Sequence, residues 1–230
     1  YLNFVESCLI LSRTIDNNNE LSSLIKSFLN DVKDEELIKF NIGNIIKVKK
    51  ILSNKNIPEK AIEESIKIFA KMDRVVVRRL NYAFGISLFS GSRELKENQN
   101  STALYYNYGR TIILNKNRTF DPSGTIMNPY KIAGTTITMT KPKTLALKLE
   151  NNETAWVGGA EIRGLYGAVG MELKDIFSTL RCKKSWFIFD DEIVALGAAI
   201  NQKEEAAVNT IIDNVTTREE YLKIIVNGNE

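Results

Sequence analysis

The chain has 230 residues, of which 43% are hydrophobic and 26% charged, which is enough for one large or two small globular domains and argues against a disordered chain. Its 31 basic and 28 acidic residues leave a formal charge of +3, too small to indicate nucleic acid as a partner. It contains no histidine, which excludes His-based zinc sites, Ser-His-Asp triads and Cys-His pairs within it, so that a general base would have to be Asp, Glu, Lys or Tyr.

The two cysteines, Cys8 and Cys182, are too far apart in sequence for a zinc cluster or a disulfide framework. One bridge and two buried thiols both remain open. No run of about 18 uncharged apolar residues occurs, so we expect no membrane-spanning helix. The first residues have neither a basic leader nor a small-residue cleavage site and resemble the middle of a helix. We therefore expect the chain to be a piece of a longer protein.

The first third of the chain has helical periodicity. Asn19 is a candidate N-cap for a helix that carries its apolar residues on one face. These residues are Leu21, Leu24, Ile25, Phe28, Leu29 and Val32. A second helix is predicted over residues 34–52, with Gly43 as its weak point. A third is predicted to begin at Pro58, with Ile62, Ile66 and Phe69 on its buried side.

After Met72 the sequence consists of short β-branched or aromatic runs separated by Asn, Gly, Pro and Asp. Examples are "RVVVRRL", "AFGISLFS", "TTITMT" and "TLALKLE". This pattern is typical of a large antiparallel β structure. The predicted organisation is a helical domain over residues 1–72 and a β domain over residues 73–230, an α+β chain that is mainly β.

Five segments of the chain together resemble polysaccharide lyase family 8, which comprises hyaluronate, chondroitin and xanthan lyases. They are "FAKMDRVVVRRLNYAFGISLFSGSR" (69–93), "NPYKIAGTT" (128–136), "WVGG" (156–159), "YGAVGMEL" (166–173) and "KKSWFIFDDEIVALGAAI" (183–200). They occur in the family's order, and the resemblance covers about residues 69–215. It implies the last helices of an α/α toroid followed by an antiparallel β super-sandwich of the galactose-mutarotase-like type.

The resemblance also implies β-elimination on a uronic-acid polymer. In the family an Asn neutralises the sugar carboxylate, a His/Tyr pair transfers the protons, an Arg supports the site and a Glu reaches in from the β domain. Offsetting the carboxylate charge makes the neighbouring carbanion accessible to a poised base. The Asn, His and Tyr of the family belong to the toroid upstream of residue 1, so this chain alone is expected to be inactive.

Some family positions can be placed on this sequence. Of the arginine motif, Ser12 and Arg13 are kept, whereas Leu9 stands where the first arginine would be. The glutamate motif is compressed to "RELKENQN", in which Glu97 is the best candidate for the catalytic Glu and Glu94 the second. Asn100 aligns with the last asparagine of that motif. The family's His after "MDR" is Val77 here. The resulting candidates are Glu97 and Arg13 for catalysis, and Asn98, Asn100 and Tyr106 for substrate binding.

Other conspicuous residues have a simpler structural interpretation. Tyr105, Tyr106 and Tyr108 could stack on sugars, but strand tyrosines more often pack across strands. Trp156–Gly159 and Tyr166–Gly170 are predicted to be tight turns with close backbone approach. Trp186, Phe187 and Phe189 are predicted to pack in the core. Asp190, Asp191 and Glu192 lie between two apolar runs and are interpreted as the corner of a hairpin rather than a metal cluster. No cofactor and no metal site are predicted.

The leading hypothesis is a fragment of a secreted lyase that acts on an acidic, glycosaminoglycan-like polysaccharide, with neither nucleic acid nor a membrane as partner. The alternative is a non-catalytic relative whose sandwich serves as a carbohydrate-binding or interaction module. The Leu9 substitution and the shortened Glu97 loop favour this alternative. A third hypothesis is a purely structural β domain that supports a toroid.

Overall fold

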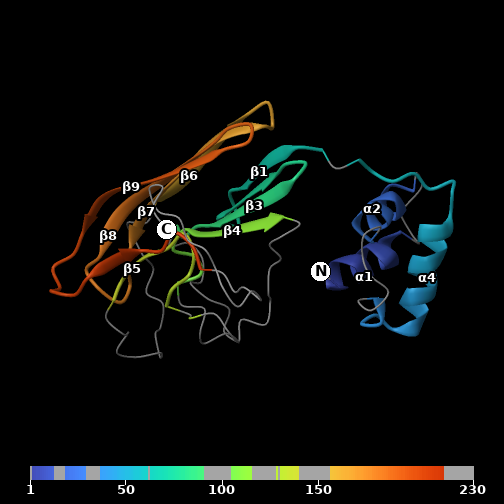
Figure 1. Ribbon diagram of the computed structural model, residues 1–230, viewed down its shortest axis with the longest axis horizontal. Helices are drawn as coiled ribbons and strands as arrows, with labels where there is room; N and C mark the ends of the chain where they lie inside the picture. The colour runs from blue at the N-terminus through green and yellow to red at the C-terminus, as the bar shows by residue number, and fades with distance from the viewer. Residues whose placement is uncertain are drawn as a thin grey trace, which may run out of the picture. The chain divides into compact units, whose positions relative to one another are not determined.

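The computed structural model describes residues 2–12, 19–29, 37–61, 63–90, 105–115, 128, 130–139 and 156–214. The chain divides into two compact units, Tyr1–Glu63 and Glu64–Glu230, the first helical and the second built of strands (Figure 1). The division comes earlier than the predicted boundary at residue 72. None of the described helices is both long and apolar enough to cross a membrane.

The helical unit contains α1 (Leu2–Leu11), α2 (Glu20–Leu29) and α4 (Ile42–Ser53). The helix predicted after Asn19 is present as α2, but Asn19 has a left-handed backbone with φ 55, not the extended backbone of an N-cap. Asn41 caps α4 instead, because its side chain accepts a hydrogen bond from the Asn44 amide at 2.9 Å. The buried core consists of Val5, Cys8, Leu9, Ile25, Leu29, Leu37, Phe40 and Val48.

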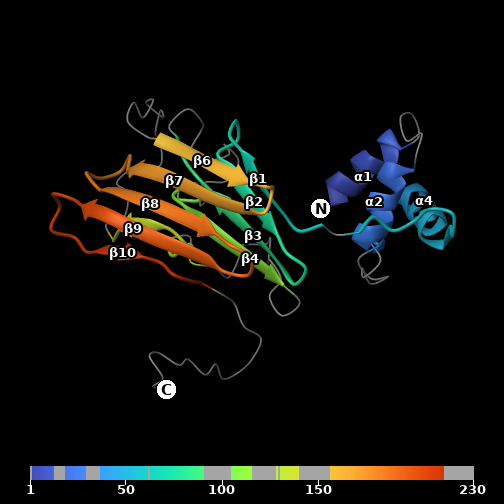
Figure 2. The ribbon, with the colours of Figure 1, turned by 90° about the horizontal axis from the view of Figure 1, so that it is seen from above.

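The β unit contains two four-stranded antiparallel sheets that lie face to face (Figure 2). The first has the order β1 (Ser65–Phe69), β2 (Arg74–Arg78), β3 (Tyr82–Ser87) and β4 (Arg110–Asn115). The second has the order β6 (Trp156–Ile162), β7 (Tyr166–Lys174), β8 (Arg181–Ile188) and β9 (Ile193–Asn201). The short strands β5 (Thr136–Thr138) and β10 (Val208–Thr210) pair with each other.

The prediction of a helix after Pro58 is wrong, because Ser65–Phe69 forms β1. Ile66 pairs with Val77 of β2 across an antiparallel ladder, and Ile66 is buried while Phe69 is 39% exposed. The spacing of Ile62, Ile66 and Phe69 matches a helix only by coincidence. The run "SIKIF" also alternates apolar and polar residues, and the pairing partner "RVVVR" decides in favour of the strand.

The core of the β unit lies between the two sheets. From the first sheet it takes residues such as Ile66, Val77, Phe84 and Ile86, and from the second Val169, Met171, Leu173, Cys182, Trp186 and Ile188. The sheets approach closely where β1 crosses the second sheet: a Cβ added to Gly167 would lie 2.4 Å from Ile66 Cδ1. Both cysteines are buried free thiols, so the bridge left open by the sequence is not formed.

The glycine motifs do not form the predicted tight turns. Trp156–Ile162 and Tyr166–Lys174 are the paired strands β6 and β7, with Gly158 opposite Gly170. The predicted close approach is present, however, because Cβ atoms added to these two glycines would lie 2.7 and 2.8 Å from the Trp156 indole. The small residues therefore make room for an indole ring that lies across the sheet.

The acidic residues after β8 form the predicted hairpin corner. β8 ends at Ile188, β9 begins at Ile193, and Asp190, Asp191 and Glu192 are exposed between them. The described residues contain no group of three or more potential metal-binding side chains. The core prediction holds for Trp186, which is 1% exposed, but is wrong for Phe187 and Phe189, which are 37% and 44% exposed. In β8 the side chains alternate, so Phe187 points away from the core that Trp186 enters.

Gly134 is expected to tolerate substitution less well than Gly164, although both have positive φ, +83 and +66. A Cβ at Gly134 would lie 2.5 Å from the Gly109 carbonyl oxygen and 2.7 Å from the Thr111 amide, whereas a Cβ at Gly164 meets nothing within 4 Å. Gly164→Ala should cost about 1 kcal/mol for its backbone, and Gly134→Ala about 1–2 kcal/mol more because backbone must move. Urea unfolding of both variants measures this, and equal losses would contradict the crowding.

Candidate functional site

Four of the five predicted site residues, Arg13, Glu97, Asn98 and Asn100, lie outside the described residues. Tyr106 lies within them. Three of these four residues belong to segment 91–104. The candidate site is therefore built from the residues on either side of that segment, which are Ser90 before it and the turn from Tyr105 to Arg110 after it. These two flanks meet at the turn between β1 and β2.

Asp73, in the turn that precedes β2, holds the flank before segment 91–104. It is 4% exposed and has a left-handed backbone with φ 54. Its carboxylate accepts hydrogen bonds from the amide and the hydroxyl of Ser90, at 2.9 and 2.6 Å. Its carbonyl oxygen accepts a further bond from the Leu88 amide at 2.9 Å. The carboxylate thus fixes the last residue before the segment.

Arg74, the first residue of β2, holds the flank after the segment. One guanidinium nitrogen donates to the carbonyl oxygens of Asp73, at 3.0 Å, and Leu88, at 3.4 Å. The other donates to Asn107 Oδ1 at 2.8 Å. Neighbouring residues therefore fix both flanks of segment 91–104, and we call Asp73 and Arg74 the Asp73–Arg74 clamp. Sequence reasoning missed it, although both residues belong to the quoted "MDR" motif.

Tyr106 lies beneath a second arginine in the same cluster. The Arg110 guanidinium carbon is 4.2 Å from the centroid of the Tyr106 ring, a cation–π contact. Burial lowers the pKa of Arg110, and the nearby positive charge of Arg74 acts in the same direction. Burial also lowers the pKa of Arg74, and Asp73 opposes this. An arginine stays protonated at neutral pH, so the cluster around Tyr106 and Asn107 contains two cations.

Tyr105 and Tyr108 are packing residues and not a sugar-stacking platform. They are 1% and 0% exposed, and their rings contact each other edge to face at 5.4 Å. The Tyr108 hydroxyl donates to Asp175 Oδ1 at 3.0 Å and accepts from the Ile176 amide at 3.1 Å. Burial raises the pKa of Asp175, although three hydrogen bonds to its carboxylate oppose this. The tyrosines lie in the turn before β4, not in a strand as predicted.

Lys184 is a buried cation that the sequence did not single out. It is 7% exposed and lines a cavity of about 750 Å³ between the two sheets, together with Trp186, Gly134 and Thr136. Its ammonium group donates to the Gly134 carbonyl oxygen and lies 3.5 Å from the Tyr108 carbonyl oxygen. Burial lowers its pKa to about 8. These contacts assign it to packing.

The chemistry that the described cluster offers is charge stabilisation. The two guanidinium groups are engaged within the fold, Arg74 by backbone carbonyl oxygens and Asn107 Oδ1 and Arg110 by the Tyr106 ring, so they contribute a positive potential and not free donors. Asp73, the carboxylate nearest to them, is engaged by Ser90. Among the described residues this cluster therefore supplies positive charge and positioning, and proton transfer would require other groups.

Asp73→Ala is expected to lower the free energy of unfolding of the 230-residue chain by about 2 kcal/mol. The Ser90 amide loses its acceptor, and alanine disfavours a φ of 54. Asp73→Asn keeps an acceptor oxygen and tolerates left-handed backbone, so its cost should stay below about 1 kcal/mol. Urea unfolding followed by tryptophan fluorescence measures both. Equal losses for the two variants would show that the carboxylate position is not held by these bonds.

Comparison with known proteins assigns the chain to a protein family. Residues 64–230 match the model of the polysaccharide lyase family 8 super-sandwich domain. The chain belongs to polysaccharide lyase family 8. The matched range begins at the first residue of the β unit, and the predicted family and fold class, mainly antiparallel β, are confirmed.

Individual relatives agree with this family. The chain is 33% identical to a xanthan lyase of a Bacillus species over 171 residues, which are 72% of the chain and 18% of that protein. It is 34% identical to a hyaluronate lyase of Thermasporomyces composti over 157 residues, 64% of the chain and 20% of that protein. A solved structure of a Paenibacillus xanthan lyase superposes with a TM-score of 0.81 at 29% identity, covering 92% of the chain and 21% of that protein. The chain thus spans less than a quarter of the length of these relatives.

Two positions where this polysaccharide lyase family 8 chain departs from the expected motif lie in the core. Leu9, in place of the first arginine, is 2% exposed and packs in the core of the helical unit. Val77, in place of the motif's histidine, is 0% exposed between the sheets. Neither side chain offers a charge or a hydrogen bond. The apolar surroundings of both positions suit the residues that are present.

Proposed function

We propose that this chain is part of a secreted polysaccharide lyase that cleaves a uronic-acid-containing polysaccharide by β-elimination. The observation that carries the proposal is the family match over residues 64–230. Relatives at 33% and 34% identity, named xanthan lyase and hyaluronate lyase, support the class of substrate. Secretion follows from the substrate, because such polymers are too large to reach an enzyme inside a cell.

The reaction makes three demands on the protein. A base removes the proton next to the uronate carboxylate, the electron pair forms a carbon–carbon double bond, and the bond to the leaving oxygen breaks as that oxygen takes up a proton. The charge that builds up on the carboxylate must be offset. The chain has no histidine, so the His of the family's His/Tyr pair must come from sequence outside it.

The contribution proposed for this chain is positioning and charge. Glu97, Asn98 and Asn100 would reach the substrate from segment 91–104, whose flanks the Asp73–Arg74 clamp holds. Arg13 stays the second catalytic candidate of the family motif. Arg74 and Arg110 add positive charge in the cluster around Tyr106 and Asn107, which favours a polymer that carries carboxylates. Tyr106 holds Arg110 through its ring face.

The experiment uses the longer protein that carries these residues. It is incubated with hyaluronan, chondroitin sulfate and xanthan, and the ultraviolet absorbance of the unsaturated uronate product is followed. Product from at least one polymer supports the proposal. The 230-residue chain alone should form no product, and product from it would show that the base lies within the chain.

A non-catalytic, carbohydrate-binding relative is the second candidate, and one observation favours it. Leu9 is buried among apolar residues, so the cation that the family motif would place there is absent. Binding of one of the three polymers by the longer protein, without any unsaturated product, would select this candidate over the lyase.

A further inference from the structure

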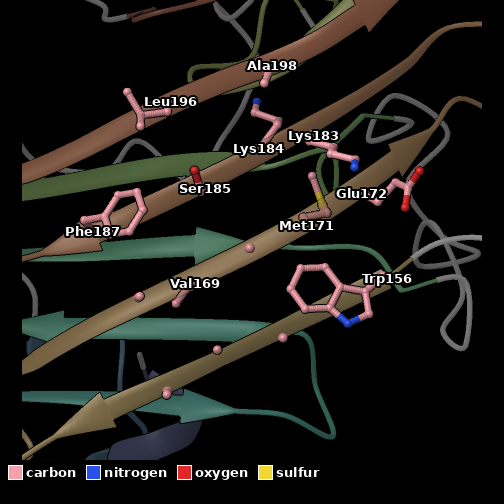
Figure 3. Close-up of a pocket in the computed structure, with 15 residues that line it drawn as sticks. Trp156, Val169, Met171, Glu172, Lys183, Lys184, Ser185, Phe187, Leu196 and Ala198 are labelled. Atoms are coloured by element: carbon pink, nitrogen blue, oxygen red, sulfur yellow. The ribbon is translucent and has the colours of Figure 1, made fainter.

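The second sheet has an outer face, directed away from the core, that is apolar and paved with small residues. Along β8, Cys182, Lys184, Trp186 and Ile188 are buried and the alternate residues point outward. The ladder places Gly158 opposite Gly170 and Ala160 opposite Ala168 on this outward side. We call it the outer face, and its members are Trp156, Gly158, Ala160, Ala168, Gly170, Ser185, Phe187, Leu196 and Ala198 (Figure 3).

The outer face is hollowed. A depression of about 770 Å³ lies on this face. The Trp156 indole lies over Gly158 and Gly170, and Phe187 and Leu196 stand away from it at the other side of the depression (Figure 3). Trp156 is 57% exposed and Leu196 54% exposed. A contiguous apolar surface that contains a depression marks an interaction site more often than a solvated face.

The sequence of β9 indicates that this face is covered. Its nine residues, "IVALGAAIN", contain no charge, whereas a strand with one face in water alternates apolar and polar residues. Charged groups on the outward side gather at one end of the depression, which Glu172 and Lys183 line. Lys174 and Arg181 lie beyond them on the same strands. An uninterrupted apolar strand is typical of a sheet that is buried on both faces.

We propose that the outer face is an internal interface, covered by an apolar protein surface with bulky aliphatic or aromatic side chains that is supplied by sequence outside these 230 residues. Bulky side chains are required to fill the part of the depression that the Trp156 indole leaves open. The longer relatives have ample sequence for this, because the chain spans 18% and 20% of two of them.

Two other occupants fit the face less well. A saccharide needs polar partners around each ring, and the polar side chains of the depression are confined to Glu172, Lys183, Lys184 and Ser185, of which Lys184 points to the other side of the sheet. A second copy placed by a two-fold axis would set one depression against another and leave both unfilled.

Cysteine labelling tests the proposal. Ala198→Cys lies on the outer face, and Asp191→Cys at the exposed hairpin corner is the matched control. A water-soluble maleimide is applied to each variant, and the labelled peptide is identified by mass spectrometry. In the longer protein we expect Ala198→Cys to react at least about 100-fold more slowly than Asp191→Cys, because closed interfaces open rarely. In the 230-residue chain both should react at similar rates.

Three results would overturn the proposal. The first is equal labelling of the two variants in the longer protein. The second is protection of Ala198→Cys in the 230-residue chain that grows with concentration, which would identify a second copy. The third is protection in the longer protein that appears only when hyaluronan oligosaccharide is added, which would identify a saccharide site.

A second variant keeps the test decisive if Ala198→Cys disturbs folding. Leu196→Lys places a charge on the outer face, where Leu196 is 54% exposed. It should lower the Tm of the longer protein by at least about 5 °C and leave that of the 230-residue chain nearly unchanged. An unchanged Tm in the longer protein would contradict an internal interface.

Discussion

Arg79→Ala is expected to lower the free energy of unfolding of the β unit by about 4 kcal/mol. Arg79 is 5% exposed and lies between three separate parts of the fold. Its guanidinium donates to the carbonyl oxygens of Leu165, at 2.8 Å, and Phe189, at 2.7 Å. Its Nε donates a further hydrogen bond to the Asp190 carbonyl oxygen at 2.5 Å. Leu165 is in the β6–β7 turn and the other two are at the β8–β9 corner.

The loss is large because three carbonyl oxygens lose a charged donor at once, in partly buried surroundings. A buried acceptor left unsatisfied costs its full desolvation penalty, and the alanine also leaves a void. Arg79 follows β2 of the first sheet, and its hydrogen bonds connect that sheet to the β6–β7 turn and to the β8–β9 corner of the second sheet. Its removal therefore affects the alignment of the two sheets as well as single bonds.

The neighbouring Arg78 is the matched control, because it is exposed at the end of β2. Arg78→Ala should change the free energy of unfolding by less than about 0.5 kcal/mol. Urea unfolding followed by tryptophan fluorescence reports on the β unit, since both tryptophans of the chain, Trp156 and Trp186, lie in it. Similar losses for the two arginine variants would refute a joining role for Arg79.

Lys184→Met is expected to change how the stability of the chain depends on pH. Burial lowers the pKa of Lys184 from 10.5 to about 8 in the folded chain. Between these two values the unfolded chain binds more protons at this residue than the folded chain does, so stability rises with pH there. At neutral pH the burial of the charge lowers the free energy of unfolding by about 3 kcal/mol, and this destabilisation disappears as the pH rises toward 10.5.

The measurement is the difference in free energy of unfolding between wild type and Lys184→Met across pH. From pH 7.5 to 9.5, wild type should gain about 2 kcal/mol relative to the variant. Groups that titrate in this range far from Lys184 are present in both proteins and largely cancel in the difference. Lys183→Met, on the exposed outward side of the same strand, is the matched control. A flat difference for Lys184→Met would mean that its ammonium group is solvated.

The sequence predicts the β architecture well, because its signals are local. Alternating runs bounded by Gly, Pro and Asn mark strands whichever partners they find, and the acids at Asp190–Glu192 mark a corner between two of them. Five motifs in family order also identified the sandwich. The Ser65–Phe69 strand was missed because three apolar residues happened to match helical spacing, and only the partner strand β2 decides between the two structures.

Which face of a strand enters the core could be predicted only in part. Trp186, Phe187 and Phe189 are all large and aromatic, so composition alone placed all three inside. Alternation along β8 puts Trp186 and Phe187 on opposite faces. The apolar character of Phe187 indicates a second packed face rather than a second position in the same core.

The candidate site was less predictable than the fold. The Asp73–Arg74 clamp contacts Ser90 and Asn107, which are 17 and 33 positions away, and the Arg110–Tyr106 contact lies within one turn. No spacing rule links these residues. Arg79 was likewise invisible, because its partners are backbone carbonyl groups that leave no trace in the side-chain sequence. Glu97, Asn98, Asn100 and Arg13 stay predictions, supported by the family resemblance.

The rate at which the longer protein releases unsaturated uronate from hyaluronan, chondroitin sulfate or xanthan is the most direct test of the proposed lyase. The account predicts product from at least one polymer. It also predicts that Glu97→Gln slows the reaction at least about tenfold, through loss of a carboxylate at the reacting centre, whereas Glu94→Gln has a smaller effect. Absence of product from all three polymers, while at least one of them binds, would contradict the lyase and establish a binding module in its place.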